Sequence, residues 1–212
     1  CHVASVLGTY GFASPTYFPS PRDVTMGNDA MLGICREKGD LVRMLVTVNP
    51  NYTRHAHDEI ERCVAQGAVG IKLLASRRAD DPLLDRICDL PAEHRLPVLH
   101  HIWQHRRRDW PNQEISDGAD LARVACRHTS VTFILAHIGG GGKAALEPFL
   151  EVARERPNLF FDLGTSGMPR GVFKWLTENA PVEQILYGSD HPLNSFTFQL
   201  GRVLYADVSL DI

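Results

Sequence analysis

The sequence predicts an α/β fold built on a parallel sheet, and two observations support this prediction. Short apolar runs recur along the chain and are nearly continuous, which is typical of strands buried on both faces. Amphipathic segments with helix caps and stops lie between these runs. From the second run onward, the runs begin near residues 41, 69, 97, 131, 158 and 184. These spacings are close to the roughly 30 residues of a βα unit.

Seven runs are predicted to be strands. They are Val3–Leu7, Leu41–Val48, Ala68–Leu74, Pro97–Leu99, Val131–Ala136, Asn158–Phe161 and Gln184–Tyr187. Such units build either an open doubly wound sheet or a closed eight-stranded barrel, and seven strands are one short of a barrel. No low-complexity linker interrupts the pattern, so we expect residues 1–212 to form a single domain.

Helix signals stand between the runs. Glycine or proline follows several amphipathic segments, as expected just past a helix end. Thr53 is predicted to cap one helix, and either Ser116 or Asp117 another. The expected helices are Asn28–Lys38, Thr53–Gln66, a segment from Ser116 or Asp117 to Arg127, and Gly142–Arg156.

Composition excludes several classes of protein. The chain has 22 Lys+Arg and 25 Asp+Glu residues and a formal net charge of −3, so it has no basic excess for binding nucleic acid. Its apolar stretches are too short to span a membrane, so we expect no membrane partner. Its five cysteines are widely spaced and odd in number, which favours reduced thiols and a cytoplasmic location.

Polar side chains follow several of the predicted strands. His100 and His101 follow one strand and His137 the next, Asp162 and Asp190 follow later strands, and Lys72 lies within an earlier one. Imidazole and carboxylate groups on converging strands suit Zn²⁺ or Mn²⁺. For each residue alone a structural role is the commoner explanation, and Asp162 or Asp190 could cap the next helix. Several such residues in consecutive βα units favour a functional site.

The pair His55 and His57 resembles a metal-binding H-x-H motif. The motif binds one ion on a strand, where residues i and i+2 share a face. Here a turn and a helix cap precede it, and on a helix the two side chains diverge by about 200°. We therefore expect both histidines on the surface of a helix, away from the site.

The segment from Trp103 to Gly118 is a long connection that contains Arg106, Arg107 and Arg108. It fits an active-site lid and a solvated insertion equally well.

Four segments, in this order, resemble a known family. They are Gly70–Leu73, Leu96–His101, Ile134–Gly140 and Leu186–Pro192. The chain resembles the amidohydrolase-related family of metal-dependent (β/α)₈ TIM-barrel hydrolases. The same branch includes enzymes similar to aminocarboxymuconate-semialdehyde decarboxylase. The resemblance covers essentially the whole chain and implies a barrel with a divalent metal, Zn or Mn.

The resemblance also implies roles for individual residues. His101 matches a metal-binding histidine. His137 matches a histidine that binds a second metal or polarises the substrate carbonyl. Asp190 matches an aspartate that touches the metal and moves protons. Lys72 matches a lysine of the fourth strand, for which a structural ion pair is an equally good role.

One departure from the family concerns its first strand. That strand ends in D-x-H-x-H and supplies two further ligands, whereas this chain has no such motif. We align Val3–Leu7 with the family's second strand, because the distance from there to Asn28 fits that placement. The sequence therefore predicts an incomplete barrel with seven of eight strands, lacking the first and truncated at both ends.

The expected activity is hydrolysis of a small amide, ester or lactone by a metal-activated water. Asp190 and His137 are the expected catalytic residues, and His101, His137 and Asp190 the expected metal ligands, converging at one mouth of the barrel. Trp103 and Arg106 are expected to bind the small-molecule substrate. Two alternatives stay open: decarboxylation of a small unsaturated or aromatic acid, and a truncated chain without activity. A homo-oligomer is compatible with the sequence.

Overall fold

Seven strands form one parallel sheet in which they lie side by side in chain order. The computed structural model describes residues 2–4, 18–102, 114, 116–139, 143–165, 167 and 171–209. The strands are β1 His2–Ala4, β2 Val42–Val48, β3 Gly70–Leu73, β4 Val98–His100, β5 Phe133–Leu135, β6 Leu159–Asp162 and β7 Ile185–Leu186. Each overlaps one predicted apolar run, so the prediction of a parallel α/β fold is confirmed.

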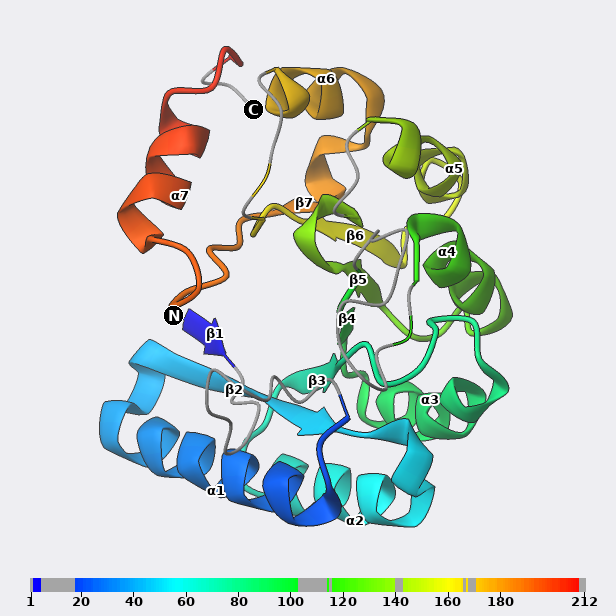
Figure 1. Ribbon diagram of the computed structural model, residues 1–212, viewed down its shortest axis with the longest axis vertical. Helices are drawn as coiled ribbons and strands as arrows, with labels where there is room; N and C mark the ends of the chain where they lie inside the picture. Colours follow the sequence, from blue (N-terminus) through cyan, green and yellow to red (C-terminus); the bar gives the residue numbers. More distant parts are fainter. Residues whose placement is uncertain are drawn as a thin grey trace.

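The sheet has two open edges in the described part of the chain. There β1 pairs only with β2, and β7 pairs only with β6. Figure 1 shows the strands in an arc, with helices along its outer side. This is the arrangement of an incomplete TIM barrel.

The helices follow the strands in βα order. They are α1 Pro21–Lys38, α2 Thr53–Val64, α3 Pro82–His94, α4 Gly118–Arg127, α5 Lys143–Ala153, α6 Val172–Asn179 and α7 Phe196–Leu204. Short 3₁₀ turns are η1 Gly39–Leu41, η2 Pro50–Tyr52, η3 Ala136–Gly139 and η4 Val182–Gln184. Among the described helices, none is both long and apolar enough to cross a membrane.

Helix starts differ from the sequence prediction in two places. Helix α1 begins at Pro21 rather than Asn28, because Ser20 and Asp23 form a reciprocal capping box ahead of it. Thr53 is the first residue of α2 rather than its cap, since its hydroxyl donates a hydrogen bond to the Pro50 carbonyl. Of the two candidates for α4, Asp117 is the cap and accepts from the Asp120 N–H at 3.0 Å.

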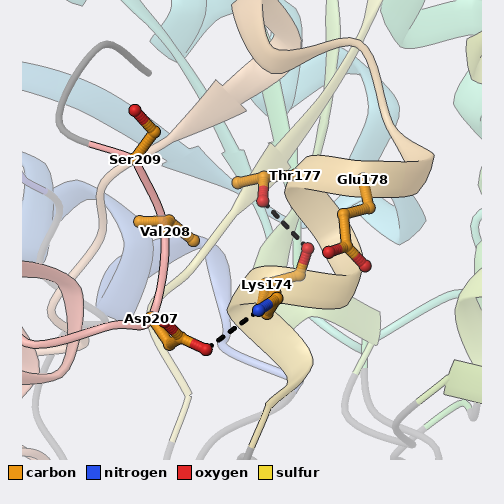
Figure 2. A pocket seen from close by; sticks show the side chains of 6 residues that line it. All are labelled: Lys174, Thr177, Glu178, Asp207, Val208 and Ser209. Carbon is orange, nitrogen blue, oxygen red and sulfur yellow. Dashed lines mark hydrogen bonds and ion pairs between the residues drawn. The ribbon is translucent and has the colours of Figure 1, made fainter.

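The segment that follows α7 returns to α6. The ammonium of Lys174 pairs with the carboxylate of Asp207 at 2.9 Å across these two elements. Figure 2 shows the pocket of about 350 Å³ that they border. It is lined by Lys174, Thr177, Glu178, Asp207, Val208 and Ser209. No imidazole lines it, so it is not the site that the sequence predicts.

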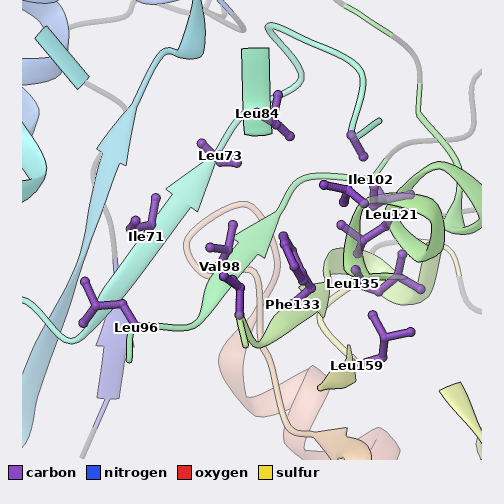
Figure 3. Packing of buried hydrophobic residues seen from close by; sticks show 14 of the residues in the cluster. Ile71, Leu73, Leu84, Leu96, Val98, Ile102, Leu121, Phe133, Leu135 and Leu159 are labelled. Atoms are coloured by element: carbon purple, nitrogen blue, oxygen red, sulfur yellow. The ribbon is translucent and has the colours of Figure 1, made fainter. Parts of the chain in front are cut away.

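The two faces of the sheet differ in character. Paired residues of neighbouring strands share a face. The row on the helix side is apolar and belongs to the buried core; it comprises Val46, Ile71, Val98, Phe133 and Leu159. Figure 3 labels the last four of them. The row on the opposite side, which we call the inner face, comprises Thr47, Lys72, Leu99, Ile134 and Phe160. Lys72 is therefore the one charged residue of the inner row.

Candidate functional site

The adjacent histidines at the end of β4 point to different faces of the sheet. His100 pairs with Leu73 and Leu135, so its side chain lies on the helix side, where it is buried. The N–H of His101 donates to the Leu73 carbonyl at 2.9 Å, so the extended backbone continues through His101. Alternation then turns the His101 side chain toward the inner face. The family-matched histidine is thus the one at the site.

His101 and His137 are in direct contact. Nε2 of His137 lies 3.1 Å from Nδ1 of His101, and the rings meet edge to face with centroids 4.6 Å apart. His137 sits in η3, immediately after β5, and its backbone is left-handed with φ of 60°. This conformation directs the ring back over the strand ends.

Hydrogen bonds determine which nitrogens carry protons. Nδ1 of His137 lies 2.5 Å from the Gly164 carbonyl, which can only accept, so Nδ1 donates. Burial, reinforced by the charge of Lys72, lowers the pKa of His137 to about 4, so the ring is neutral and Nε2 accepts. His101 therefore donates through Nδ1, which places its own lone pair on Nε2.

Gly164 joins His137 to the carboxylates. Its N–H donates to Oδ1 of Asp162 at 2.8 Å, while its carbonyl accepts from His137. A Cβ on Gly164 would lie 3.1 Å from the backbone nitrogen of Asp190. The segments after β5, β6 and β7 therefore meet around this glycine, which places Asp190 beside the loop that binds His137.

Gly188 is required by close packing. A Cβ at this position would lie 1.7 Å from Oδ1 of Asp162, a distance that no side chain tolerates. The glycine in the Gly188–Ser189–Asp190 segment thus makes room for the carboxylate of Asp162. Asp190 itself has a left-handed φ of 52°, and its Oδ2 accepts from the Asn194 side chain at 2.9 Å.

The charged groups at this edge perturb one another. Burial lowers the pKa of Lys72 to about 8, and the charges of Asp162 and Asp190 limit that decrease. Burial raises the pKa of Asp162 to about 6 and also raises that of Asp190. Buried groups with pKa values shifted in opposite directions are common at active sites.

The donor atoms agree in part with a metal site. A lone pair on His101 Nε2, with its other nitrogen held by His137, is how metal-binding histidines are usually arranged, and Asp190 offers carboxylate oxygens. In the described residues, however, no three His, Cys, Asp or Glu side chains lie close enough to hold an ion. These residues therefore fit part of a coordination shell.

The remaining sequence predictions have different outcomes. His55 and His57 lie on α2, as predicted, where their Nε2 atoms approach the hydroxyl of Thr25 and the carbonyl of Arg86. Trp103 and Arg106 lie outside the described residues. Sequence reasoning missed Gly164 and Asn194, whose roles depend on contacts between separate loops. The sequence did single out Lys72, because it is a lone charged residue inside an apolar strand.

Solved structures with this fold include an uncharacterized protein and several enzymes, among them one solved with manganese bound. An uncharacterized TIM-barrel protein of Bordetella bronchiseptica matches with a TM-score of 0.72 and 14% identity, over 88% of this chain and 68% of that one. A 2,6-dihydroxybenzoate decarboxylase from Rhizobium matches with a TM-score of 0.72 and 14% identity, over 96% and 78%. A manganese-bound 5-carboxyvanillate decarboxylase of Novosphingobium aromaticivorans matches with a TM-score of 0.64 and 16% identity, over 88% and 64%. At these identities the likeness shows the fold.

The sequence comparison gives the family. A search of curated proteins finds no match. The model of the amidohydrolase family matches residues 21–211, which contain every described residue of the site. The chain therefore belongs to the amidohydrolase family.

Proposed function

We propose that this chain carries the active site of a metal-dependent hydrolase that acts on a small amide, ester or lactone. The observation that carries the proposal is the contact between His101 and His137 near the buried Lys72 and the half-buried Asp162 and Asp190. A bound Zn²⁺ or Mn²⁺ would supply a water with a pKa of about 7. The ion would be held by Nε2 of His101 and by Asp190. The family resemblance also implies His137 as a ligand, but in the described arrangement both of its nitrogens are bonded.

The side chains of the site have separate proposed roles in the reaction. Asp190 is proposed to accept the proton of the attacking water and to return it to the leaving group, because it is half-buried and its pKa is raised. The family resemblance also implies a catalytic role for His137. In the arrangement described above, both its nitrogens are bonded, so there it acts as a positioning residue that orients His101. Trp103 and Arg106 as substrate-binding residues, and a cytoplasmic location, stay predictions.

Decarboxylation is the second candidate. Decarboxylases of 2,6-dihydroxybenzoate and of 5-carboxyvanillate share the fold, and the latter was solved with manganese and a nitrobenzoic acid bound. The same residues would then act on a small aromatic acid. Detection of released CO₂ distinguishes this reaction from hydrolysis.

The test replaces the proposed base. In a chain that includes an upstream H-x-H strand, we expect about one Zn²⁺ or Mn²⁺ per chain. Asp190→Asn should abolish turnover of a simple ester such as 4-nitrophenyl acetate while the thermal melt is retained, because it removes the proton acceptor and keeps the volume. The exposed Asp58→Asn on α2 is the control and should be fully active. Full activity of Asp190→Asn would place the base elsewhere.

A further inference from the structure

Lys72 occupies the centre of the inner face. It lies on β3, paired with Thr47 on one side and Leu99 on the other. Its chain neighbours Ile71 and Leu73 point to the helices and belong to the apolar core. The ammonium group therefore projects to the side of the sheet on which His101 and Asp162 also lie.

The N–H groups of the Lys72 ammonium have no hydrogen-bond acceptor within the described residues. Lys72 is 8% exposed, and within the described residues its side chain makes no hydrogen bond or ion pair. A structural ion pair, one of the two roles considered from the sequence, is therefore not formed there. Asp162 and Asp190 act on Lys72 only through longer-range attraction. A buried ammonium with three N–H donors and no acceptor is costly unless a ligand supplies one.

We infer that Lys72 donates a hydrogen bond to the carbonyl oxygen of the substrate and stabilises the oxyanion that forms on it. This inference rests on the proposed hydrolase function and adds a catalytic residue to it. Preorganised N–H donors aimed at a developing oxyanion are among the strongest contributions to acyl transfer.

His137, the other candidate for this role, fits less well. His137 has no N–H left for the substrate, because Nδ1 donates to Gly164 and Nε2 faces His101. A carbonyl oxygen gains negative charge as water adds, so its attraction to the Lys72 ammonium grows toward the transition state. A pKa of about 8 leaves Lys72 mostly protonated at neutral pH.

The proposed reaction is the addition of water to the carbonyl, followed by loss of the leaving group. The oxygen of a water molecule forms a bond to the carbonyl carbon, and one water proton passes to Asp190. The carbonyl π electrons move to the oxygen, which becomes the oxyanion bound by Lys72. The oxyanion collapses, the bond to the amine or alcohol leaving group breaks, and Asp190 returns the proton to that group.

The test compares Lys72→Met, which keeps length and apolar contacts, with Lys174→Met in the exposed pair with Asp207. With 4-nitrophenyl acetate and the chain that includes an upstream H-x-H strand, Lys72→Met should lower kcat by about 10²–10³-fold with little change in KM, while Lys174→Met should resemble the parent. Ligand binding provides a test that does not depend on turnover. Phenylphosphonate mimics the tetrahedral oxyanion, and benzamide mimics the neutral carbonyl. Lys72→Met should weaken phenylphosphonate binding at least about tenfold and benzamide binding far less.

A third measurement avoids any variant at this site. In ¹³C-lysine-labelled protein, phenylphosphonate should shift the ε-carbon resonance of Lys72. Equal phenylphosphonate binding by both variants, together with an unmoved Lys72 resonance, would overturn the inference. If the chain that includes an upstream H-x-H strand lacks hydrolase activity but phenylphosphonate binding still depends on Lys72, the proposed function fails and the oxyanion site stands. If Asp190→Asn is inactive and Lys72→Met is not impaired, the function stands and the role of Lys72 fails.

Discussion

His137 and Ile138 are adjacent residues that both hold a left-handed backbone, with φ of 60° and 49°. This conformation costs an L-residue roughly 1–2 kcal/mol, and a β-branched residue such as Ile138 adopts it rarely. Contacts offset the cost: the Ile138 side chain is buried in the core, and the His137 ring donates to Gly164. The strained pair thereby holds an imidazole over the strand ends, which fits the common placement of strain at functional sites.

Glu59 gives a pH-dependent test at the residue scale. It is 5% exposed on α2, and its carboxylate accepts hydrogen bonds from Arg62, Asn28 and Thr25. Burial alone would raise its pKa, but these partners outweigh burial and lower the pKa below 4.5. The lowered pKa means that Glu59 stabilises the fold above about pH 4.5 and that this contribution is lost as the pH falls further.

Glu59→Gln should therefore destabilise the protein by about 1–3 kcal/mol at pH 7, because a charged acceptor is lost from a buried network. The difference from the parent should shrink in urea unfolding at pH 3–4. Asp58→Asn, on the exposed face of the same helix, is the control and should change the unfolding free energy by less than about 0.5 kcal/mol. A pH-independent difference for Glu59→Gln would show that charge is not the cause.

At the scale of elements, two glycines differ in the space that surrounds them. Gly33 lies inside α1, where a Cβ would meet nothing within 4 Å. Gly70 begins β3, where a Cβ would lie 2.6 Å from a Leu45 methyl and 2.9 Å from the Pro97 carbonyl oxygen. That carbonyl accepts the Ile71 N–H, so it cannot move without weakening the ladder between β3 and β4.

Gly33→Ala should stabilise the protein by about 0.5–1 kcal/mol, because alanine restricts the unfolded chain and favours the helix. Gly70→Ala should destabilise it by about 1–3 kcal/mol through overpacking. Urea midpoints measured side by side provide the comparison, and each variant serves as the control for the other. If Gly70→Ala leaves the urea midpoint unchanged, β2 and β4 pack less tightly against this position than the distances to Leu45 and Pro97 indicate.

At the scale of the whole molecule, open edges and exposed apolar side chains occur together. Within the described residues β1 and β7 each pair on one side only. Large apolar side chains are exposed on and after α7, among them Leu204 at 64% and Tyr205 at 91%. Unpaired edges and contiguous apolar surface both favour association between chains.

We therefore expect the 212-residue chain to associate or to be poorly soluble, and to show little hydrolase activity with added Zn²⁺ or Mn²⁺. Sedimentation velocity measures the association. Leu204→Lys with Tyr205→Lys should reduce it, whereas Leu41→Lys, at an exposed position in η1, should have a smaller effect. A monodisperse parent monomer with a cooperative melt would contradict the expectation.

The sequence by itself determined the order and position of the strands, because continuous apolar runs such as Val131–Ala136 record burial on both faces, and burial follows from local composition. It also excluded His55 and His57 from the site, since the geometry of a helix separates residues i and i+2. The family motifs singled out His101, His137 and Asp190 from sequence order alone.

Only the tertiary structure decided how these residues meet. Strand register turned Lys72 to the inner face and His100 away from it, and register depends on pairing between distant segments. The closure of Gly164 and Gly188 around Asp162 consists of contacts between backbone and side chain, which carry no periodic signal. Such contacts form when separate loops are brought to one edge of the sheet, so the chain encodes them only through its fold.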